Sequence, residues 1–199
     1  MTTTSLILLR HGEPEHRNCL LGRLDSAPIP DGLASCLAAV AGLEFGLIVS
    51  SPLRRAAAAA EAIAGAAGLR VTYDDRWQEL DFGDWDGKTV EEIANADRAQ
   101  LEAFWSDPDS DPPPGGEPWS AIKARVAAAT LEIASTENQL PVLVVTHAGA
   151  IRALVAAMCS FDFAQTMRLE LPYASWIRLN VFVGHEFPPS ATIHSLKAP

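Results

Sequence analysis

The sequence predicts a single α/β domain over residues 1–199, with a three-layer α/β/α arrangement and a mainly parallel central sheet. Two observations carry this prediction. Apolar runs without polar alternation, such as residues 6–9 and 142–145, are typical of strands buried on both faces. Helix-like segments lie between such runs, and this alternation favours parallel strands joined by crossover helices. A chain of 199 residues, 48% of them hydrophobic, is long enough for one such core.

The first predicted strand ends on side chains that can carry chemistry. Residues 6–9 are large and aliphatic, and Arg10 and His11 follow them directly. Ligands of open α/β sheets bind at the carboxyl ends of strands, so a guanidinium and an imidazole there form a candidate phosphate site. A lone histidine at a strand end is also consistent with local hydrogen bonding. Residues 14–30 are rich in turn formers without periodicity, which predicts a loop covering this edge.

The following segments continue the alternation of helix and strand. We expect a helix over residues 31–43, a strand over 45–51 and a second helix over 54–67. The second helix is dense in alanine, the strongest helix former, and Gly68 is placed to cap it. Such a slim helix can pack closely on a sheet. A short strand over residues 69–73 comes next.

The middle of the chain contains its most irregular segments. Residues 77–87 mix aromatic and turn-forming residues and are too irregular for a helix, whereas residues 89–104 have helical spacing and a start typical of a capped helix. Residues 107–116 contain three consecutive prolines and two glycines, which exclude regular structure. We therefore expect a second site-covering segment near residues 105–118.

The last third of the chain returns to regular alternation. A long helix is predicted over residues 119–135, a buried strand over 142–146, a helix over 151–158 and a late strand over 175–183. No element is predicted for the residues that follow.

Composition and charge exclude several kinds of partner. A net charge of −10 argues against nucleic acid or an anionic membrane as a partner. The odd cysteine count, with Cys19, Cys36 and Cys159 outside any metal-binding spacing, favours free thiols and a cytoplasmic location. No run is apolar enough to span a bilayer, and the start lacks a basic leader. We expect no metal and no cofactor, and the oligomeric state stays open, a homodimer included.

Four separated motifs carry a more specific signal. They are Arg10-His11-Gly12-Glu13, Ser51-Pro52-Leu53-Arg54-Arg55-Ala56, Glu79-Leu80-Asp81-Phe82-Gly83 and Thr146-His147-Ala148-Gly149. In these motifs and in their order, the chain resembles the histidine phosphatase superfamily, also called the phosphoglycerate mutase-like family. The compact length and the Arg-His-Gly-Glu-Pro start look most like its phosphatase branch, which includes α-ribazole phosphatases.

The resemblance implies a catalytic role for each of three residues. His11 would be the nucleophile that forms a phosphohistidine, with its second ring nitrogen donating to a backbone carbonyl. His147 would bind the transferring phosphoryl group as a cation, assisted by the backbone N–H of Ala148. Glu79 would give the proton to the leaving group. Neighbouring Asp81, Asp84 and Asp86 are interpreted as solvated turn carboxylates.

Arginines are expected to hold the phosphate oxygens. Arg10 belongs to the first motif, and the register of the second motif selects Arg55 over Arg54. The family often has Asn a few residues beyond the first motif, where this chain has Arg17 followed by Asn18. We favour Arg17 as the phosphate contact, because the interval matches without a gap, and Asn18 is the alternative. A solvent-facing Arg17 is equally compatible with the sequence.

The expected function is that of a metal-independent phosphomonoesterase acting on a small phosphorylated metabolite through a phosphohistidine intermediate. A phosphoglycerate mutase is the alternative within the same fold, although the chain has little room for the longer insertions of mutases. A catalytically silent phosphate-binding protein is a third option. The presence of both histidines, both motif arginines and Glu79 argues against it.

Overall fold

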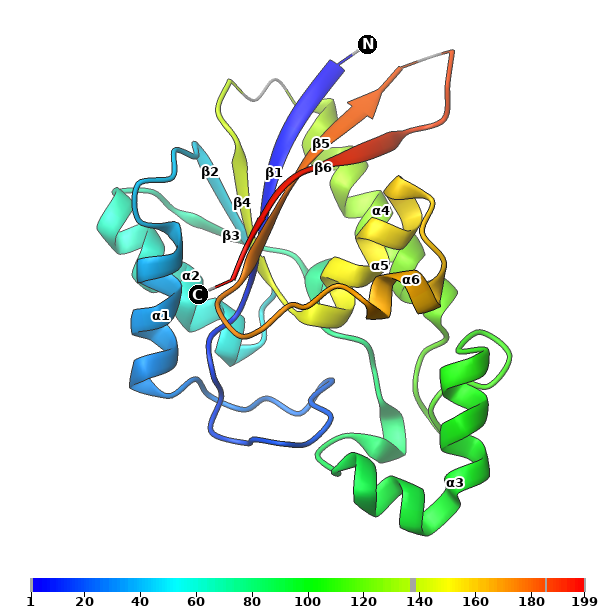
Figure 1. Cartoon of the computed structure of the whole chain (residues 1–199). Helices are drawn as coiled ribbons and strands as arrows, with labels where there is room; N and C mark the ends of the chain where they lie inside the picture. Colours follow the sequence, from blue (N-terminus) through cyan, green and yellow to red (C-terminus); the bar gives the residue numbers. More distant parts are fainter. Residues whose placement is uncertain (1, 137–138, 185, 199) are drawn as a thin grey trace.

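The computed structural model describes residues 2–136, 139–184 and 186–198. In these ranges the chain forms a six-stranded sheet flanked by helices, in the strand order β3-β2-β4-β1-β5-β6 (Figure 1). The strands are β1 (Thr2–Arg10), β2 (Leu47–Ser50), β3 (Val71–Tyr73), β4 (Val142–Thr146), β5 (Trp176–Val183) and β6 (Ser190–Lys197). The helices are α1 (Pro30–Val40), α2 (Arg54–Ala67), α3 (Val90–Ser106), α4 (Trp119–Ser135), α5 (Ala148–Cys159) and α6 (Phe163–Met167).

The sheet is parallel in its core and antiparallel at one side. Strands β3, β2, β4 and β1 run parallel to one another, whereas β5 is antiparallel to β1 and β6 is antiparallel to β5. The predicted α/β class and the parallel core are therefore confirmed. Strand β6 was not predicted, because most of its side chains are exposed and its sequence lacks a clear alternation of apolar and polar residues.

Helices cover both faces of the sheet, as the apolar runs predicted. In β1, Leu6 and Leu8 belong to the core shared with α4 and α5, while Ile7 and Leu9 face the core under α1 and α2. Every residue of β4 is buried. Helix α2 packs closely through its small side chains, and Gly68 ends it in the left-handed conformation (φ 69°).

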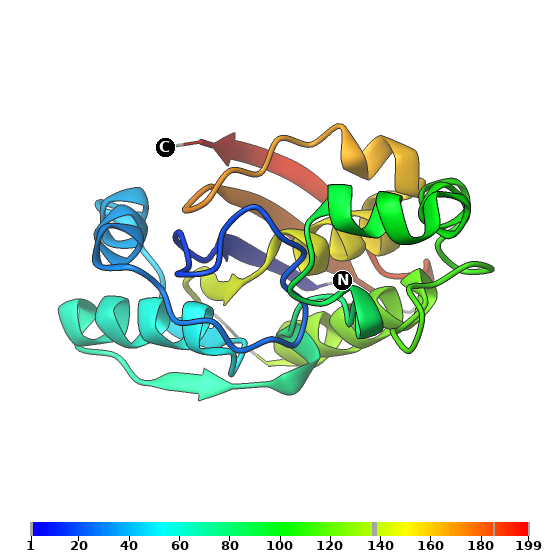
Figure 2. The ribbon, with the colours of Figure 1, turned by 90° about the horizontal axis from the view of Figure 1, so that it is seen from below.

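The carboxyl edge of the parallel strands is covered by two segments. Residues 14–30 run across this edge in the view from below (Figure 2). Helix α3 stands apart from the sheet on the same side, and the loop after it leads back to α4 (Figure 1).

Three short elements differ from the sequence predictions. Two of them are short 3₁₀ helices: Asp75–Trp77 ends where the segment predicted to be irregular (residues 77–87) begins, and Gly83–Trp85 lies within that segment. Helix α6 has only five residues, too few for periodicity to reveal, and a capping box between Asp162 and Gln165 holds its start.

None of the helices in the described ranges combines the length and the apolar character needed to cross a bilayer.

Candidate active site

The sheet brings the two predicted histidines together. Strands β1 and β4 are adjacent and in register, with Arg10 opposite Thr146, so the residues that follow both strands leave the same edge. The imidazole rings of His11 and His147 lie 5.0 Å apart between centroids and are both buried. The predicted pairing of the two motifs is therefore present in the fold.

The surroundings of His11 leave one ring nitrogen available for attack. Its Nδ1 lies 2.7 Å from the carbonyl oxygen of Gly12. Because a carbonyl can only accept, Nδ1 carries the proton and Nε2 keeps its lone pair. Burial lowers the pKa of His11 well below its ordinary value, and the nearby charges of Arg55 and Arg10 lower it further. His11 is thus a neutral imidazole with a free nucleophilic nitrogen.

His147 contacts Ser51, the first residue of the second motif. Its Nε2 lies 2.8 Å from the hydroxyl of Ser51, while its buried Nδ1 has no hydrogen-bond partner among the described residues. Burial lowers the pKa of His147 well below its ordinary value, and Arg55 and His11 add to the effect. The protein alone therefore favours a neutral His147, whereas the sequence analysis expected a cation.

Arg10 lies at the rim of the same site. One of its N–H groups donates to the carbonyl of Leu171, and its guanidinium carbon lies 4.0 Å from the centre of the Tyr173 ring, a cation–π contact. Its Nε is buried and has no hydrogen-bond partner within the described chain. Arg10 is held in place and keeps donors for an anion.

Arg55 has a further role that the sequence did not indicate. It is fully buried, and its Nη1 and Nη2 donate to the carbonyls of Leu24, Leu21 and Gly22 at 2.8–3.0 Å. Its Nε remains without a partner in the described structure. Arg55 therefore ties the loop over residues 21–24 to the start of α2, next to the two histidines.

Asp86 holds the same loop from the opposite side. Its carboxylate accepts hydrogen bonds from the backbone N–H groups of Gly22, Arg23 and Leu24 at 2.7–2.8 Å. The sequence analysis treated Asp86 as a solvated turn residue, and this interpretation was wrong. Its partners lie more than 60 residues away in the chain, where no local pattern could reveal them.

We expect Asp86→Ala to loosen this loop. Loss of hydrogen bonds to a charged, partly exposed acceptor should cost about 1.5–3 kcal/mol of loop stability. KM should rise roughly threefold to tenfold, since Leu20 and Leu21 line the pocket. Steady-state kinetics and limited proteolysis within residues 20–25 measure both effects. The exposed Asp84→Ala, in the same segment, is the control, and equal behaviour of the two variants would contradict this role for Asp86.

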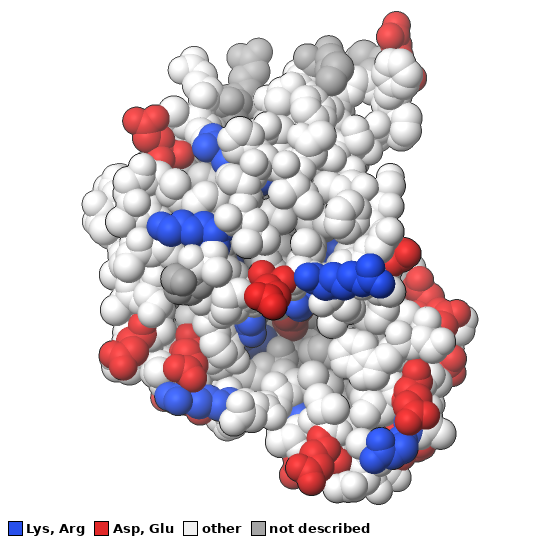
Figure 3. All heavy atoms as spheres, viewed as in Figure 1, with Lys and Arg blue, Asp and Glu red and all other residues white. Residues whose placement is uncertain are grey.

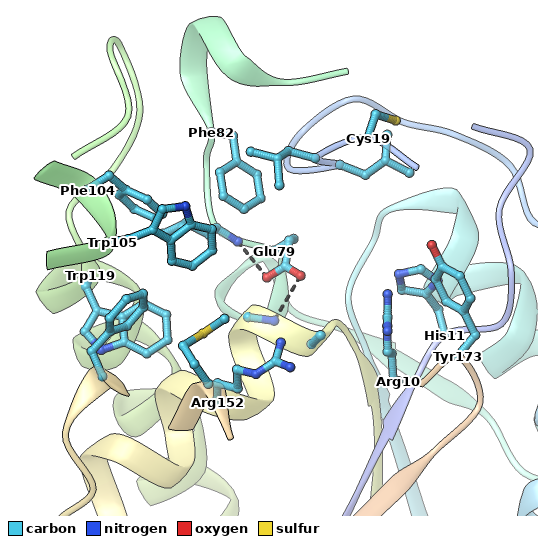
Figure 4. A pocket seen from close by; sticks show the side chains of 17 residues that line it. Arg10, His11, Cys19, Glu79, Phe82, Phe104, Trp105, Trp119, Arg152 and Tyr173 are labelled. Atoms are coloured by element: carbon cyan, nitrogen blue, oxygen red, sulfur yellow. Dashed lines mark hydrogen bonds between the residues drawn. The ribbon is translucent and has the colours of Figure 1, made fainter. Parts of the chain in front are cut away.

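Glu79 is fixed at the start of α5. Its Oε1 accepts from the N–H groups of Leu80 (2.9 Å) and Ala150 (3.1 Å), and its Oε2 accepts from that of Gly149 (3.0 Å). A methyl group on Gly149 would lie 2.2 Å from Oε1, so only glycine permits this approach. Figure 4 shows the carboxylate turned toward the pocket, between the aromatic side chains and Arg10. The N–H of Ala148, at the first position of α5, has no acceptor within its own helix.

Some of these groups line one end of a pocket of about 190 Å³. Arg10, His11 and Glu79 form the polar end, with Ala148 beside them, and aromatic side chains form the other end (Figure 4). The aromatic end is lined by Phe82, Phe104, Trp105, Trp119 and Phe163. On the surface, acidic and basic side chains are interspersed, and Lys or Arg atoms are visible within a hollow (Figure 3). The pocket therefore offers a place for an anion beside a place for an apolar or planar group.

Two pocket residues were not anticipated. Arg152 lies five residues after His147, just beyond the last of the four motifs, and was given no role from the sequence. Tyr173 comes from the irregular segment before β5, and its ring lies 5.6 Å from that of His11. Nothing in the sequence near Tyr173 indicates a site, because only the fold brings that segment to the strand ends.

Arg17 and Asn18 lie outside the pocket lining. Both are exposed, and Arg17 forms an ion pair with Glu13 at 3.2 Å, four residues before it. Asn18 adopts the left-handed conformation (φ 59°). The structure thus brings together His11, His147, Glu79, Arg10, Arg55 and Ala148, but neither of the two loop residues.

The described residues hold neither a metal cluster nor a disulfide. No group of three or more His, Cys, Asp or Glu side chains arranged for a metal ion is found among the described residues. The three cysteines are free thiols, as predicted, and Cys19 lies at the pocket.

A family model described as the histidine phosphatase superfamily (branch 1) matches residues 6–187. The chain belongs to the histidine phosphatase superfamily. The family resemblance drawn from the four motifs is thereby confirmed.

Relatives in this superfamily carry names of phosphatases. The chain is 32% identical to glucosyl-3-phosphoglycerate phosphatase of Mycobacterium tuberculosis, with 96% of this chain and 90% of the relative covered. It is 31% identical to phosphoserine phosphatase 1 of Hydrogenobacter thermophilus, with 80% and 78% covered.

Solved structures of the superfamily agree in fold. The structure of mycobacterial glucosyl-3-phosphoglycerate phosphatase superposes with a TM-score of 0.85 at 30% identity, covering 96% of each chain. The α-ribazole phosphatase of Shigella flexneri gives a TM-score of 0.82 at 21% identity, covering 98% of this chain and 96% of that one. The second comparison concerns the fold alone.

Proposed function

We propose that the protein is a metal-independent phosphatase that hydrolyses a phosphomonoester through a phosphohistidine on His11. The observation that carries the proposal is the hydrogen bond from Nδ1 of His11 to the Gly12 carbonyl, which leaves Nε2 unprotonated among cationic groups. Membership of the histidine phosphatase superfamily and the phosphatase names of its relatives support the same activity.

The first half of the reaction forms the phosphohistidine. Nε2 of His11 attacks phosphorus in line while the bond from phosphorus to the ester oxygen breaks, and Glu79 gives its proton to the departing alkoxide. Arg10 and the Ala148 N–H line the pocket, where they can neutralise the equatorial oxygens, and Arg55, behind the lining, adds positive charge near His11. The negative charge of the bound ester opposes the lowered pKa of His147, so His147 binds it as an imidazolium.

The second half of the reaction regenerates the enzyme. Water attacks the phosphohistidine from the side that the alcohol has left, and the bond between phosphorus and Nε2 breaks. Glu79, now a carboxylate, takes the proton from this water. Inorganic phosphate and an alcohol are the products, and Glu79 ends in its starting protonation state.

The substrate in this proposal is a small phosphorylated metabolite. The pocket supports this, since its anion-binding end adjoins an apolar end of limited size. The named substrates of the relatives, glucosyl-3-phosphoglycerate and phosphoserine, are of this kind. A cytoplasmic location is part of the same proposal and is supported by the free thiols.

Hydrolysis in the presence of a chelator tests the proposal. Purified protein should release phosphate from p-nitrophenyl phosphate at the same rate with and without EDTA, because nucleophile, charge and acid all come from side chains. Loss of activity with EDTA and its return with a divalent ion would contradict the metal-independent mechanism. With 3-phosphoglycerate, release of free phosphate identifies a phosphatase, whereas accumulation of 2-phosphoglycerate would identify a mutase.

A further inference from the structure

Arg152 is a pocket residue to which the proposed mechanism gives no role. It lies on α5, and its Nε and Nη2 donate to the carbonyls of Thr166 (3.2 Å) and Leu169 (3.0 Å). These bonds hold the guanidinium in place beside α6. A guanidinium has five N–H groups, so three of them are not used by these two contacts.

The charge of Arg152 is not neutralised by the protein. No carboxylate of the described residues lies within ion-pair distance of it; the ion pairs are all made by other cations. Burial lowers the pKa of Arg152, the charge of Glu79 opposes this effect without an ion pair, and the charge of Arg10 lowers the pKa further. A half-buried cation with spare donors, lining a pocket, is suited to bind an anionic ligand.

The position of Arg152 differs from that of the other two arginines. Arg10 lies beside His11 and Tyr173, whereas Arg152 lies toward Trp119, on the side of the pocket formed by the aromatic residues (Figure 4). Arg55 is not part of the pocket lining at all. In the proposed mechanism the phosphate binds at the His11 end, beside Arg10. Arg152 therefore faces the part of the pocket that takes the alcohol portion of the ester.

We infer that Arg152 binds a carboxylate on the alcohol portion of the substrate and thereby selects phosphorylated hydroxy acids over neutral phosphorylated alcohols. The inference rests on the proposed function. A planar guanidinium matches the two oxygens of a carboxylate, and the surrounding apolar side chains, including Trp119 and Phe163, strengthen such a contact by excluding water. A singly charged carboxylate also fits this apolar side better than a second phosphate, which would bring more charge into it.

Two substrates that differ only in this group provide the test. 3-Phosphoglycerate carries a carboxylate where glycerol 3-phosphate carries a hydroxymethyl group. We expect wild-type protein to prefer 3-phosphoglycerate in kcat/KM, and Arg152→Gln to reduce that value by about tenfold to a hundredfold, mainly through KM. For glycerol 3-phosphate the same variant should change kcat/KM by less than about threefold, because no carboxylate contact is lost.

Arg168→Gln is the matched control. Arg168 is exposed at the end of α6 and lies outside the pocket lining, so its loss removes the same charge from the same neighbourhood. This variant should leave the ratio of the two substrates unchanged. Circular dichroism and thermal melting check that both variants are folded.

Inhibition of the wild-type protein gives a second readout that needs no variant. D-glycerate should inhibit competitively, and glycerol at equal concentration should not, since only glycerate carries the carboxylate. Equal losses for both substrates in Arg152→Gln, no wild-type preference, or equal inhibition by glycerate and glycerol would each overturn the inference. Failure of the proposed function has a different signature, namely no phosphate release from either substrate or from p-nitrophenyl phosphate.

Discussion

His11→Ala should abolish turnover, with kcat/KM for p-nitrophenyl phosphate falling by about 10³-fold or more. The reason is that the hydrogen bond to the Gly12 carbonyl leaves Nε2 of His11 unprotonated and oriented, whereas Nε2 of His147 is engaged with Ser51. Removal of a covalent nucleophile has effects of this order in other enzymes. Steady-state kinetics at a fixed enzyme concentration measure the loss.

A chemical quench during turnover tests the same role directly. Wild-type protein stopped in mid-reaction should carry acid-labile phosphate on His11, located by mass spectrometry at neutral or alkaline pH. His16→Ala is the control, because His16 is exposed, contacts Ser26 and lies outside the pocket lining. It should keep wild-type activity and labelling. Phosphate trapped on His147 instead would reverse the roles given to the two histidines.

Glu79→Gln should produce a loss that depends on the leaving group. For an alkyl ester such as glycerol 3-phosphate, kcat/KM should fall by roughly 10²- to 10⁴-fold, since the departing alkoxide needs a proton. For p-nitrophenyl phosphate, whose leaving group is stable as an anion, the fall should be much smaller. kcat/KM is the quantity to compare, because it reports steps up to departure of the alcohol and excludes hydrolysis of the phosphohistidine.

Glutamine suits this test because it keeps the size of Glu79 and can still accept from Leu80 and Ala150. The exposed Asp84→Asn, also a loss of one carboxylate in the same segment, should leave both substrates unaffected. Equal losses for both esters in Glu79→Gln would show that Glu79 positions α5 or the substrate without donating a proton.

The parts of the site that could be predicted are those that depend on neighbouring residues in the chain. Arg10 and His11 follow a buried strand, and His147 follows another, so the edge at which they meet could be inferred from the two apolar runs. Arg55 was selected by the register of a motif. None of these inferences requires knowledge of contacts between distant segments.

The parts that could not be predicted arise from such distant contacts. Tyr173 packs on Arg10, and Asp86 holds a loop more than 60 residues away, although neither has a local signature. The neutral state favoured for His147 results from its burial and from the nearby Arg55, His11 and Arg10. Neither the burial nor these neighbours can be read from the sequence around His147. The aromatic end of the pocket combines side chains from α3, α4 and α6, which only the fold brings together.

The contact between Glu79 and Gly149 sets a limit on how this protein can be improved. Glycine in the first turn of a helix lowers the stability of the fold by up to about 1 kcal/mol relative to alanine. Gly149→Ala is therefore an obvious substitution to try for higher thermal stability. The added methyl would meet the carboxylate at 2.2 Å and displace it. Helix α5 therefore keeps a residue that lowers its stability, because the position of the Glu79 carboxylate requires glycine at residue 149. At this position, selection for heat resistance and selection for activity favour different residues.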